Sequence, residues 1–410
     1  MNSHSTQLKR TALISALLLE LSTISHAANI PVDGVVCTFN DAIIAANTDT
    51  ATGGCVAGSG NDDLILPANG NLDLSATATV TSVVTVLGNQ STLQPDPNNP
   101  PFRLFNVYGG LALIHTTLQN GRDPAVAGIF VAYASHLDLF ESTVRNMDGG
   151  GVAFAHQSYG DIIASNIENC SNTIPNPFAA GLTVSSSTVN VFESTISHNS
   201  GLGSGSGGIW VNNQHSAAEL HVYASTISGN SNDSRGGGLT HSDYGNGSSI
   251  YLNNVTVTKN TSTTFGGGIA NDLASITINQ SLISGNTAAY NPEVHSTGGT
   301  VVVNNYNLFG YNNNAGVYGV TPGPLDIIPT VATLSDIIDV SLADNGGPTH
   351  THNLNPTGPA VDVVPNASCL LNYDQVGNVR PIDGNLDGIF ECDVGALEFN
   401  SDIIFKNGFE

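Results

Sequence analysis

Apolar and polar residues alternate in a phrase that the chain repeats eight times between Thr116 and Tyr306. The phrase runs apolar-x-apolar-x-x-[Ser/Thr]-x-apolar-x-x-Asn, and we call its Ser/Thr position the anchor. Successive anchors are 23 to 31 residues apart, and a period of this length is typical of stacked structural repeats. The eight anchors are Thr116, Ser142, Ser165, Ser194, Ser225, Val255, Ser281 and Tyr306.

Three apolar columns surround the anchor. The residues five and three positions before it, such as Val189 and Val191, are two apart and therefore share one face of a strand. The residue two positions after it, such as Ile196, lies five residues further on. Because an odd step cannot stay on one face of a straight strand, the chain must bend near the anchor. The repeat therefore predicts an all-β solenoid, a single-stranded parallel β-helix with these columns stacked in its interior.

Asparagine stands five residues after the anchor in four successive repeats. These residues are Asn199, Asn230, Asn260 and Asn286. If they stack in register, their amides can hydrogen-bond from coil to coil. Cys170 occupies the same column in an earlier repeat, so we predict a buried structural thiol there.

The periodic segment sets the expected domain boundaries. Residues 101–320 form the β-helix repeats, and residues 28–100 form an N-terminal cap and the first coils. Residues 321–400 lose the period and are expected to form a C-terminal cap, followed by a tail over residues 401–410. Caps are expected because open strand edges at the ends of a stack invite aggregation.

The N-terminal cap is expected to contain a short helix. Residues 37–47 form an amphipathic pattern that is helical in period and can cover the first coil.

The first 27 residues have the pattern of a secretory signal. Lys9 and Arg10 precede the apolar stretch 11–19, and a small-residue cleavage signal follows at Ser25-His26-Ala27. That stretch is too short to span a bilayer, and no later segment is long and apolar enough to do so. We therefore predict a signal peptide over residues 1–27 and an exported protein, extracellular or associated with the outer membrane or cell surface.

The charge balance narrows the range of partners. The chain carries a net charge of −24, and removal of residues 1–27 leaves −25. Such a charge repels nucleic acid and anionic lipid, so no nucleic-acid partner is expected. It attracts cations, calcium included.

Five cysteines in an exported chain predict disulfides with one thiol left over. Cys37 and Cys55 enclose a short loop near the N-terminus, and Cys369 and Cys392 enclose another near the C-terminus. Nearness in sequence favours the pairs Cys37–Cys55 and Cys369–Cys392 and leaves Cys170 free.

Both ends of the chain resemble segments of known exported proteins. Residues 37–43 (CTFNDAI), with Gly54-Cys55 and 61–66 (NDDLIL), resemble the CSLREA-type N-terminal region of exported bacterial proteins. Residues 344–352 (DNGGPTHTH) and 392–398 (CDVGALE) look like the choice-of-anchor Q segment that follows such β-helices.

The repeats are similar to those of polymorphic outer-membrane proteins and other right-handed β-helices of pectin-lyase-like shape. The resemblance implies an exported or surface-displayed right-handed parallel β-helix with a non-catalytic role in binding or adhesion.

A polysaccharide-active enzyme of the same shape is the alternative. A glycosidase needs two nearby carboxylates, and Glu141 and Glu193 stand in one column immediately before the anchor, two coils apart. A polar ladder at a bend explains the same pattern. Four basic residues of the repeats share no column, which disfavours a lyase acting on polyuronates. These are Arg122, Arg145, Arg235 and Lys259.

A second group of polar and aromatic residues follows the glycine-rich turns, where loop length varies most. Variable loops stacked on one face are where solenoids usually bind, so this group predicts a glycan or cell-surface ligand. Its members are His156, Tyr159, Asn213, His215, His241, Asp243 and Tyr244. Ordinary loop solubility explains the same composition, and the histidines lack the tight spacing of a zinc site.

The segment Asp383-Gly-Asn-Leu-Asp-Gly matches the first half of a calcium loop, with oxygen ligands at Asp383, Asn385 and Asp387. The position of the bidentate glutamate holds Val394. A structural calcium site and a plain acidic turn both fit this pattern.

The two functional hypotheses predict different surfaces. An enzyme is expected to show carboxylates that converge on two or three neighbouring coils. An adhesin is expected to show broad polar ladders without such a focus.

Overall fold

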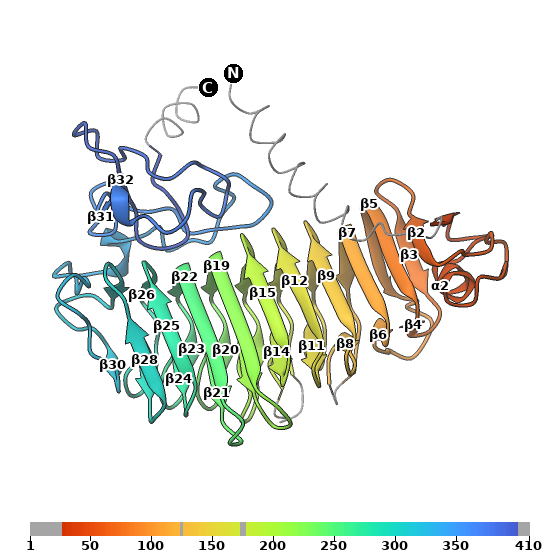
Figure 1. The fold of residues 1–410 in the computed structure, drawn as a ribbon, viewed down its shortest axis with the longest axis horizontal. Helices are drawn as coiled ribbons and strands as arrows, with labels where there is room; N and C mark the ends of the chain where they lie inside the picture. The colour runs from red at the N-terminus through yellow and green to blue at the C-terminus, as the bar shows by residue number, and fades with distance from the viewer. Residues whose placement is uncertain (1–26, 124–125, 173–177, 401–410) are drawn as a thin grey trace.

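The computed structural model describes residues 27–123, 126–172 and 178–400. The first 26 residues of the predicted signal peptide and the predicted tail, 401–410, lie outside the described residues. The predicted parallel β-helix is confirmed. Its coils follow one another along a single axis (Figure 1), and each strand pairs in parallel with the corresponding strand of the next coil.

Each coil contributes to three sheets. The first sheet contains β1 (Asn29–Pro31), β2 (Asn61–Ile65), β5 (Val83–Pro95), β7 (Gly110–Gln119), β9 (His136–Phe140), β12 (Tyr159–Ile163), β15 (Thr188–Phe192), β19 (Ala218–Ser228), β22 (Ser248–Thr258), β25 (Ser275–Asn279) and β28 (Thr300–Val303). The second contains β3 (Asn71–Leu74), the later halves of β5, β7, β19 and β22, and β10 (Thr143–Arg145), β13 (Asn166–Glu168), β16 (Thr195–Ser197), β26 (Leu282–Ser284) and β29 (Leu308–Phe309).

The third sheet has ten strands within the described ranges. They are β4 (Ala78–Val80), β6 (Phe105–Val107), β8 (Ile129–Val131), β11 (Val152–Ala155), β14 (Leu182–Ser185), β18 (Ile209–Asn212), β21 (Leu239–Ser242), β24 (Ile269–Asn271), β27 (Val294–Ser296) and β30 (Val317–Tyr318). Three two-residue strands pair beside it: β17 (Ser200–Gly201), β20 (Ser231–Asn232) and β23 (Thr261–Ser262).

The predicted bend lies at the residue before the anchor. Glu193 and Ala224 have φ values of 49° and 40° there, in the left-handed region that non-glycine residues rarely adopt. The bend is stabilised by the anchor hydroxyls, because the backbone N–H of Ser165 donates to Oγ of Ser194 at 3.0 Å. The first and second sheets therefore meet at a sharp ridge that repeats in every coil.

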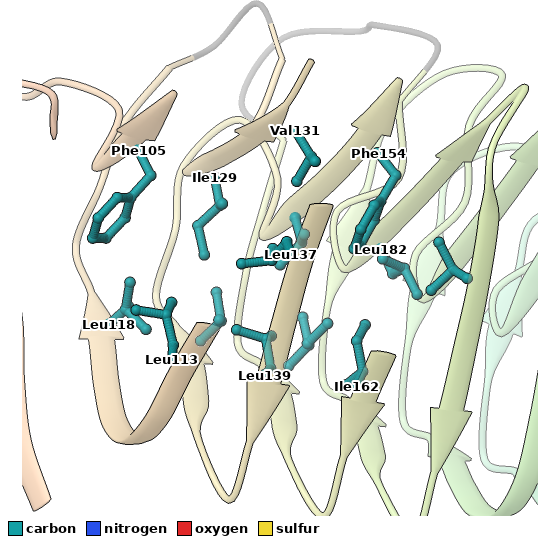
Figure 2. Packing of buried hydrophobic residues seen from close by; sticks show 14 of the residues in the cluster. Phe105, Leu113, Leu118, Ile129, Val131, Leu137, Leu139, Phe154, Ile162 and Leu182 are labelled. Carbon is teal, nitrogen blue, oxygen red and sulfur yellow. The ribbon is translucent and has the colours of Figure 1, made fainter. Parts of the chain in front are cut away.

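The inward columns form one continuous core. Val191, Val222, Leu252 and Ile278 are in direct register across four coils, and each is fully buried. Figure 2 shows leucines of the first sheet, such as Leu139, facing aromatic and aliphatic residues of the third. A single coil leaves its apolar residues exposed. In the stack, the coils before and after it cover them.

The predicted asparagine ladder is confirmed. Nδ2 of Asn199 donates to Oδ1 of Asn230 at 3.0 Å, Asn230 donates to Asn260 at 3.0 Å, and Asn260 donates to Asn286 at 2.9 Å. Cys170 sits above the ladder, with its backbone N–H donating to Oδ1 of Asn199. Its thiol is free and buried, as predicted, and burial raises the pKa of that thiol to about 12.

The last repeat was predicted one residue out of register. The backbone N–H of Ser281 donates to Oδ1 of Asn307, and Ile283 pairs with Phe309, so Asn307 rather than Tyr306 takes the anchor position. Ile278 pairs with Val303 and Leu282 pairs with Leu308. The last coil therefore has one more residue between these two pairs than the coil before it, and this residue shifts the anchor by one position.

A helix, α2 (Phe39–Thr48), packs on the first coils close to its predicted bounds. The Thr38 hydroxyl caps it by accepting from the backbone N–H of Asp41 at 3.2 Å. Phe39 sits edge-on to Phe105, with ring centroids 5.8 Å apart. Within the described ranges, no helix has the length and apolar character needed to span a bilayer.

The C-terminal segment, residues 333–399, lies along the side of the solenoid, over the outward face of the second sheet (Figure 1). It contains the short helices η1 (Leu334–Asp336) and η2 (Asn366–Ser368) and the antiparallel pair β31 (Val364–Pro365) and β32 (Glu391–Cys392). Thr226 Oγ1 donates to Gln375 Oε1 at 2.6 Å, and Ser228 Oγ lies 2.7 Å from Nε2 of His352. The segment thus covers the second sheet from β13 to β26 and leaves the outward face of the first sheet available.

Both predicted disulfides, Cys37–Cys55 and Cys369–Cys392, are present. The second closes a loop of 23 residues in the C-terminal segment, which lacks a repeating core.

Replacing Cys369 and Cys392 together with Ser is expected to lower stability by about 3 kcal/mol, because a disulfide restricts the unfolded chain. Urea unfolding of the two proteins measures this difference. Reductant should lower the stability of both proteins, because both contain Cys37–Cys55, and should largely remove the difference between them. Equal stabilities of variant and parent under oxidising conditions would contradict the prediction.

Candidate functional site

Polar and aromatic side chains lie on the outward face of the first sheet. Along each strand they alternate with the buried apolar residues of the repeat. Strand pairing aligns one outward stack, four residues before the anchor in every coil but the last: Ala112, Asp138, Asp161, Asn190, His221, Tyr251, Thr277 and Val302. A second outward stack lies two residues earlier: Gly110, His136, Tyr159, Thr188, Glu219, Ser249, Ser275 and Thr300. The acidic residues and histidines of these two stacks lie on β9, β12 and β19, and two acidic residues are adjacent on β9 and β12.

Asp138 and Asp161 lie one above the other on these two strands. The pairing of His136 with Tyr159, and of Leu139 with Ile162, places the two aspartates in register. Their backbone positions are therefore about one strand spacing, 4.8 Å, apart. The backbone N–H of Asp161 donates to Oδ1 of Asp138 at 3.0 Å.

Two further side chains complete this group. Nε2 of His136 lies 2.8 Å from Oδ1 of Asp138, and Nδ2 of Asn190 donates to Oδ1 of Asp161 at 2.8 Å. We call His136, Asp138, Asp161 and Asn190 the central cluster. It spans three neighbouring coils and contains two carboxylates, one imidazole and one amide.

The cluster shifts the protonation of its own members. Burial raises the pKa of Asp161 above its usual 3.8, the Asn190 hydrogen bond opposes this rise, and the charge of Asp138 adds to it. Burial by itself lowers the pKa of His136. The hydrogen bond and charge of Asp138, with the charge of Asp161, more than offset that effect and raise the pKa above 6.5.

The members of the cluster differ in exposure. Asp138 is only 8% exposed, so a ligand has little access to it. Its carboxylate contacts Nε2 of His136 and orients that ring. Asp161 and His136 are half-buried and reach the surface. Tyr159, 51% exposed, stacks on the His136 ring at a centroid distance of 4.5 Å. A ligand on this face therefore meets Asp161, His136 and Tyr159.

Aromatic rings continue along the same face towards β22. Phe192 stacks on Tyr223 at 5.0 Å, and His221 stacks on Tyr251 at 4.6 Å. Each ring covers one face of its neighbour, which stabilises successive coils. The half-buried ring edges still offer apolar surface next to polar groups, a combination typical of ligand sites.

The predicted catalytic candidates lie at the ridge beside this face. Glu141 Oε2 is 2.8 Å from Nε2 of His115. Glu193 stands two coils away, with Ala164 at the corresponding position between them, and its backbone oxygen accepts from Thr349 at 3.0 Å. The structure therefore does not place these two glutamates on neighbouring coils, and their catalytic role stays a prediction.

The predicted ligand-binding residues of the turns fall into separate groups. The rings of His156 and His215 are 4.3 Å apart. Asn213 donates to Asp243 at 2.7 Å and accepts from the backbone N–H of Tyr244 at 2.6 Å. Both groups lie at the turns that lead from the third sheet to the first. Their role as a binding surface also stays a prediction.

Two members of that predicted set lie elsewhere. Tyr159 belongs to the outward face of the first sheet. The prediction for His241 was wrong, because its side chain is fully buried in the interior column between Val211 and Asn271. Burial lowers the pKa of His241 to about 4, and neither ring nitrogen has a hydrogen-bond partner among the described residues.

The predicted calcium loop is a hydrogen-bonded acidic turn. Asp383 Oδ2 accepts from the backbone N–H of Gly388 at 2.9 Å, and Asn385 Oδ1 accepts from that of Asp387 at 2.9 Å. Asp387 Oδ1 accepts from Ile389 at 2.8 Å. Within the described part of the chain, no three His, Cys, Asp or Glu side chains are grouped to hold a metal ion. A calcium ion here stays a prediction.

The sequence does contain a signal for the central cluster. It lies outside the apolar columns and outside the column immediately before the anchor. The column four residues before the anchor contains Asp138, Asp161 and Asn190 in succession, and it must face outward because it alternates with the buried columns.

No protein-family model and no curated protein matches the chain, so the resemblance to CSLREA-type and choice-of-anchor Q proteins stays a prediction. A solved structure described as "The complex structure of XylC with xylose" is similar in fold, with 10% sequence identity and a TM-score of 0.46. The match covers 82% of this chain and 66% of that one, slightly under two thirds of its length. With its coils, ladders and three sheets, the chain is a parallel β-helix.

Proposed function

We propose that the protein is a polysaccharide-active β-helix that hydrolyses glycosidic bonds on the outward face of its first sheet. The observation that carries this proposal is the placement of Asp138 and Asp161 on neighbouring coils, joined to His136 and Asn190. Converging carboxylates on neighbouring coils are the feature expected of an enzyme rather than an adhesin.

The proposed hydrolysis requires one base and one acid in the central cluster. The pKa values of Asp161 and His136 are both raised, and the ordinary value of aspartate lies well below that of histidine. At a pH between the two, Asp161 is a carboxylate and His136 an imidazolium. The site then holds one base and one acid.

The reaction follows from these roles. The Asp161 carboxylate accepts a proton from a water molecule as the water oxygen forms a bond to the anomeric carbon. As the bond from that carbon to the glycosidic oxygen breaks, the His136 imidazolium donates its Nδ1 proton to the leaving oxygen. Asp138 stabilises the imidazolium through Nε2 and is a positioning residue.

Export remains part of the proposal. Two disulfides support an oxidising compartment, since such bonds are rare in the cytosol. An exported enzyme would meet its polysaccharide outside the cell.

Adhesion without chemistry is the second candidate, and a specific observation favours it. Asn279 Nδ2 donates to Asn253 Oδ1 at 2.5 Å, and Asn304 donates in turn to Asn279. This row is a polar ladder without a catalytic focus, as an adhesin would present.

Replacing Asp161 with Asn is expected to lower kcat by about a hundredfold or more, because the general base is lost, while glycan binding is retained. His136→Gln should cause a similar loss and abolish the upper limb of a bell-shaped pH–rate profile. Reducing-sugar release from a panel of polysaccharides measures both. Asp73→Asn, at an exposed carboxylate on β3 of the second sheet, serves as the control and should retain activity. Full activity in Asp161→Asn would contradict the mechanism, and binding without any cleavage by the parent would favour adhesion.

A further inference from the structure

We infer that the glycan bound on the outward face of the first sheet is uncharged, and that acidic glycans such as polyuronates are rejected. This inference rests on the proposed function and names the substrate class of the same site.

The charge of the outward face disfavours an acidic ligand. In the described ranges, no strand of the first sheet carries Lys or Arg on the part that precedes the bend. The central cluster contributes two carboxylates, and Glu219 adds a third, which lies 3.0 Å from His221. Among the described residues of these strands, histidine is thus the only basic side chain on this face.

An acidic sugar would meet unfavourable charge on this surface. Recognition of a carboxylate or sulfate in proteins relies on guanidinium or ammonium groups, which give strong charge-assisted hydrogen bonds. Here the nearest imidazolium, His136, is already engaged by Asp138. An anionic group of the ligand would lie beside the Asp161 carboxylate without a compensating cation. The two negative charges would repel each other.

The chemistry of the flanking positions favours a neutral ligand. Beyond the central cluster, the outward columns offer hydroxyls and an amide at Thr188, Thr277 and Asn253, among half-buried aromatic rings. Hydroxyls and amides both donate and accept, so they match the hydroxyl groups of a neutral sugar. Ring edges contact its C–H surface.

Two sets of oligosaccharides of equal length test the inference on the full exported chain. One set is neutral, with gluco-, xylo- and manno-oligosaccharides, and the other is oligogalacturonate. Calorimetric binding and product release are measured with EDTA and with added calcium, since calcium can bridge carboxylates on protein and ligand. Neutral oligosaccharides are expected to bind at least tenfold more tightly than oligogalacturonate under both conditions.

A charge-addition variant tests the cause. Thr188 is exposed beside Tyr159 on the neighbouring coil, so Thr188→Lys places an ammonium next to the central cluster. It should raise oligogalacturonate affinity at least tenfold. Thr300→Lys, in the same column at the far end of the first sheet, is the matched control and should not.

The outcomes separate the inference from the function on which it rests. Tighter binding or cleavage of oligogalacturonate by the parent, with or without calcium, would overturn the inference and leave the hydrolytic proposal standing. Equal responses of Thr188→Lys and Thr300→Lys would overturn charge as its cause. Absence of binding and cleavage with every glycan would overturn the proposed function itself.

Discussion

Replacing Asn230 with Ala is expected to lower the free energy of unfolding by about 4 kcal/mol, because the change leaves several buried polar groups unpaired. Oδ1 of Asn230 accepts from both the backbone N–H and Nδ2 of Asn199, each at 3.0 Å. Its Nδ2 donates to the backbone oxygen of Ile196 at 2.9 Å and to Oδ1 of Asn260 at 3.0 Å. All of these atoms lie in the solenoid interior, so water does not replace the lost partner.

The anchor ladder provides the matched control. Oγ of Ser225 accepts from the backbone N–H of Ser194 and donates to the backbone oxygen of Tyr223. The next anchor, Val255, has no hydroxyl, so the ladder already tolerates a gap. Ser225→Ala should therefore cost only about 1 kcal/mol. Urea unfolding followed by circular dichroism compares the two variants, and equal losses would contradict a special role for the asparagine ladder.

The interior of the fold could be predicted because burial imposes strict periods on the sequence. Val191 and Val222 must face the core in every coil, and the odd step to Ile196 and Ile227 requires the bend. The asparagine ladder was predictable for the same reason, since Asn199 and its partners keep a fixed distance from the anchor.

The third sheet could not be predicted in the same way. Its strands follow loops whose lengths vary from coil to coil, so the register of β21 cannot be counted from the anchor. For this reason His241 was predicted to lie in a binding loop, although it occupies the same interior column as Val211. The path of the C-terminal segment along the second sheet also escaped prediction, because polar contacts such as Ser228 with His352 have no sequence period.

The central cluster escaped prediction for a different reason. Outward positions are not constrained by burial, so the column of Asp138 and Asp161 has no apolar period and is found only when the polar positions are also aligned on the anchor. Glu141 and Glu193 were predicted as catalytic candidates instead, because they adjoin the anchor, where the repeats are easiest to align.

Stability is expected to fall between pH 6.5 and 8 because of Glu293, which closes the asparagine ladder. Its Oε2 accepts from Nδ2 of Asn286 at 2.6 Å, and its Oε1 accepts from the backbone N–H of Gly285 at 2.9 Å. The side chain is buried, and burial raises the pKa of Glu293 from 4.5 to about 8. The folded protein therefore keeps a neutral carboxyl group at the end of the ladder at neutral pH.

The direction follows from proton binding. Above pH 4.5 the unfolded chain releases the Glu293 proton while the folded chain retains it, so stability decreases as the pH rises until the folded group also ionises near pH 8. Between pH 4.5 and 8 the free energy of unfolding falls by about 5 kcal/mol, and about 2 kcal/mol of this loss occurs between pH 6.5 and 8. The buried imidazoles His241 and His352 have pKa values lowered from 6.5 to about 4. They therefore reduce stability as the pH falls below 6.5, outside the interval in which Glu293 is measured.

Glu293→Gln isolates this contribution. Its amide oxygen can accept from Asn286 as the ladder amides do, but its NH2 group faces the Gly285 N–H, so the variant starts from lower stability. Between pH 6.5 and 8 it should lose about 2 kcal/mol less than the parent, as measured by urea unfolding at each pH. Glu141→Gln, at the surface ridge, should keep the parent's slope. Parallel stability curves for Glu293→Gln and the parent would mean that this carboxyl group is ionised in the folded chain, and that the ladder ends on a charge rather than on a neutral hydrogen-bonding group.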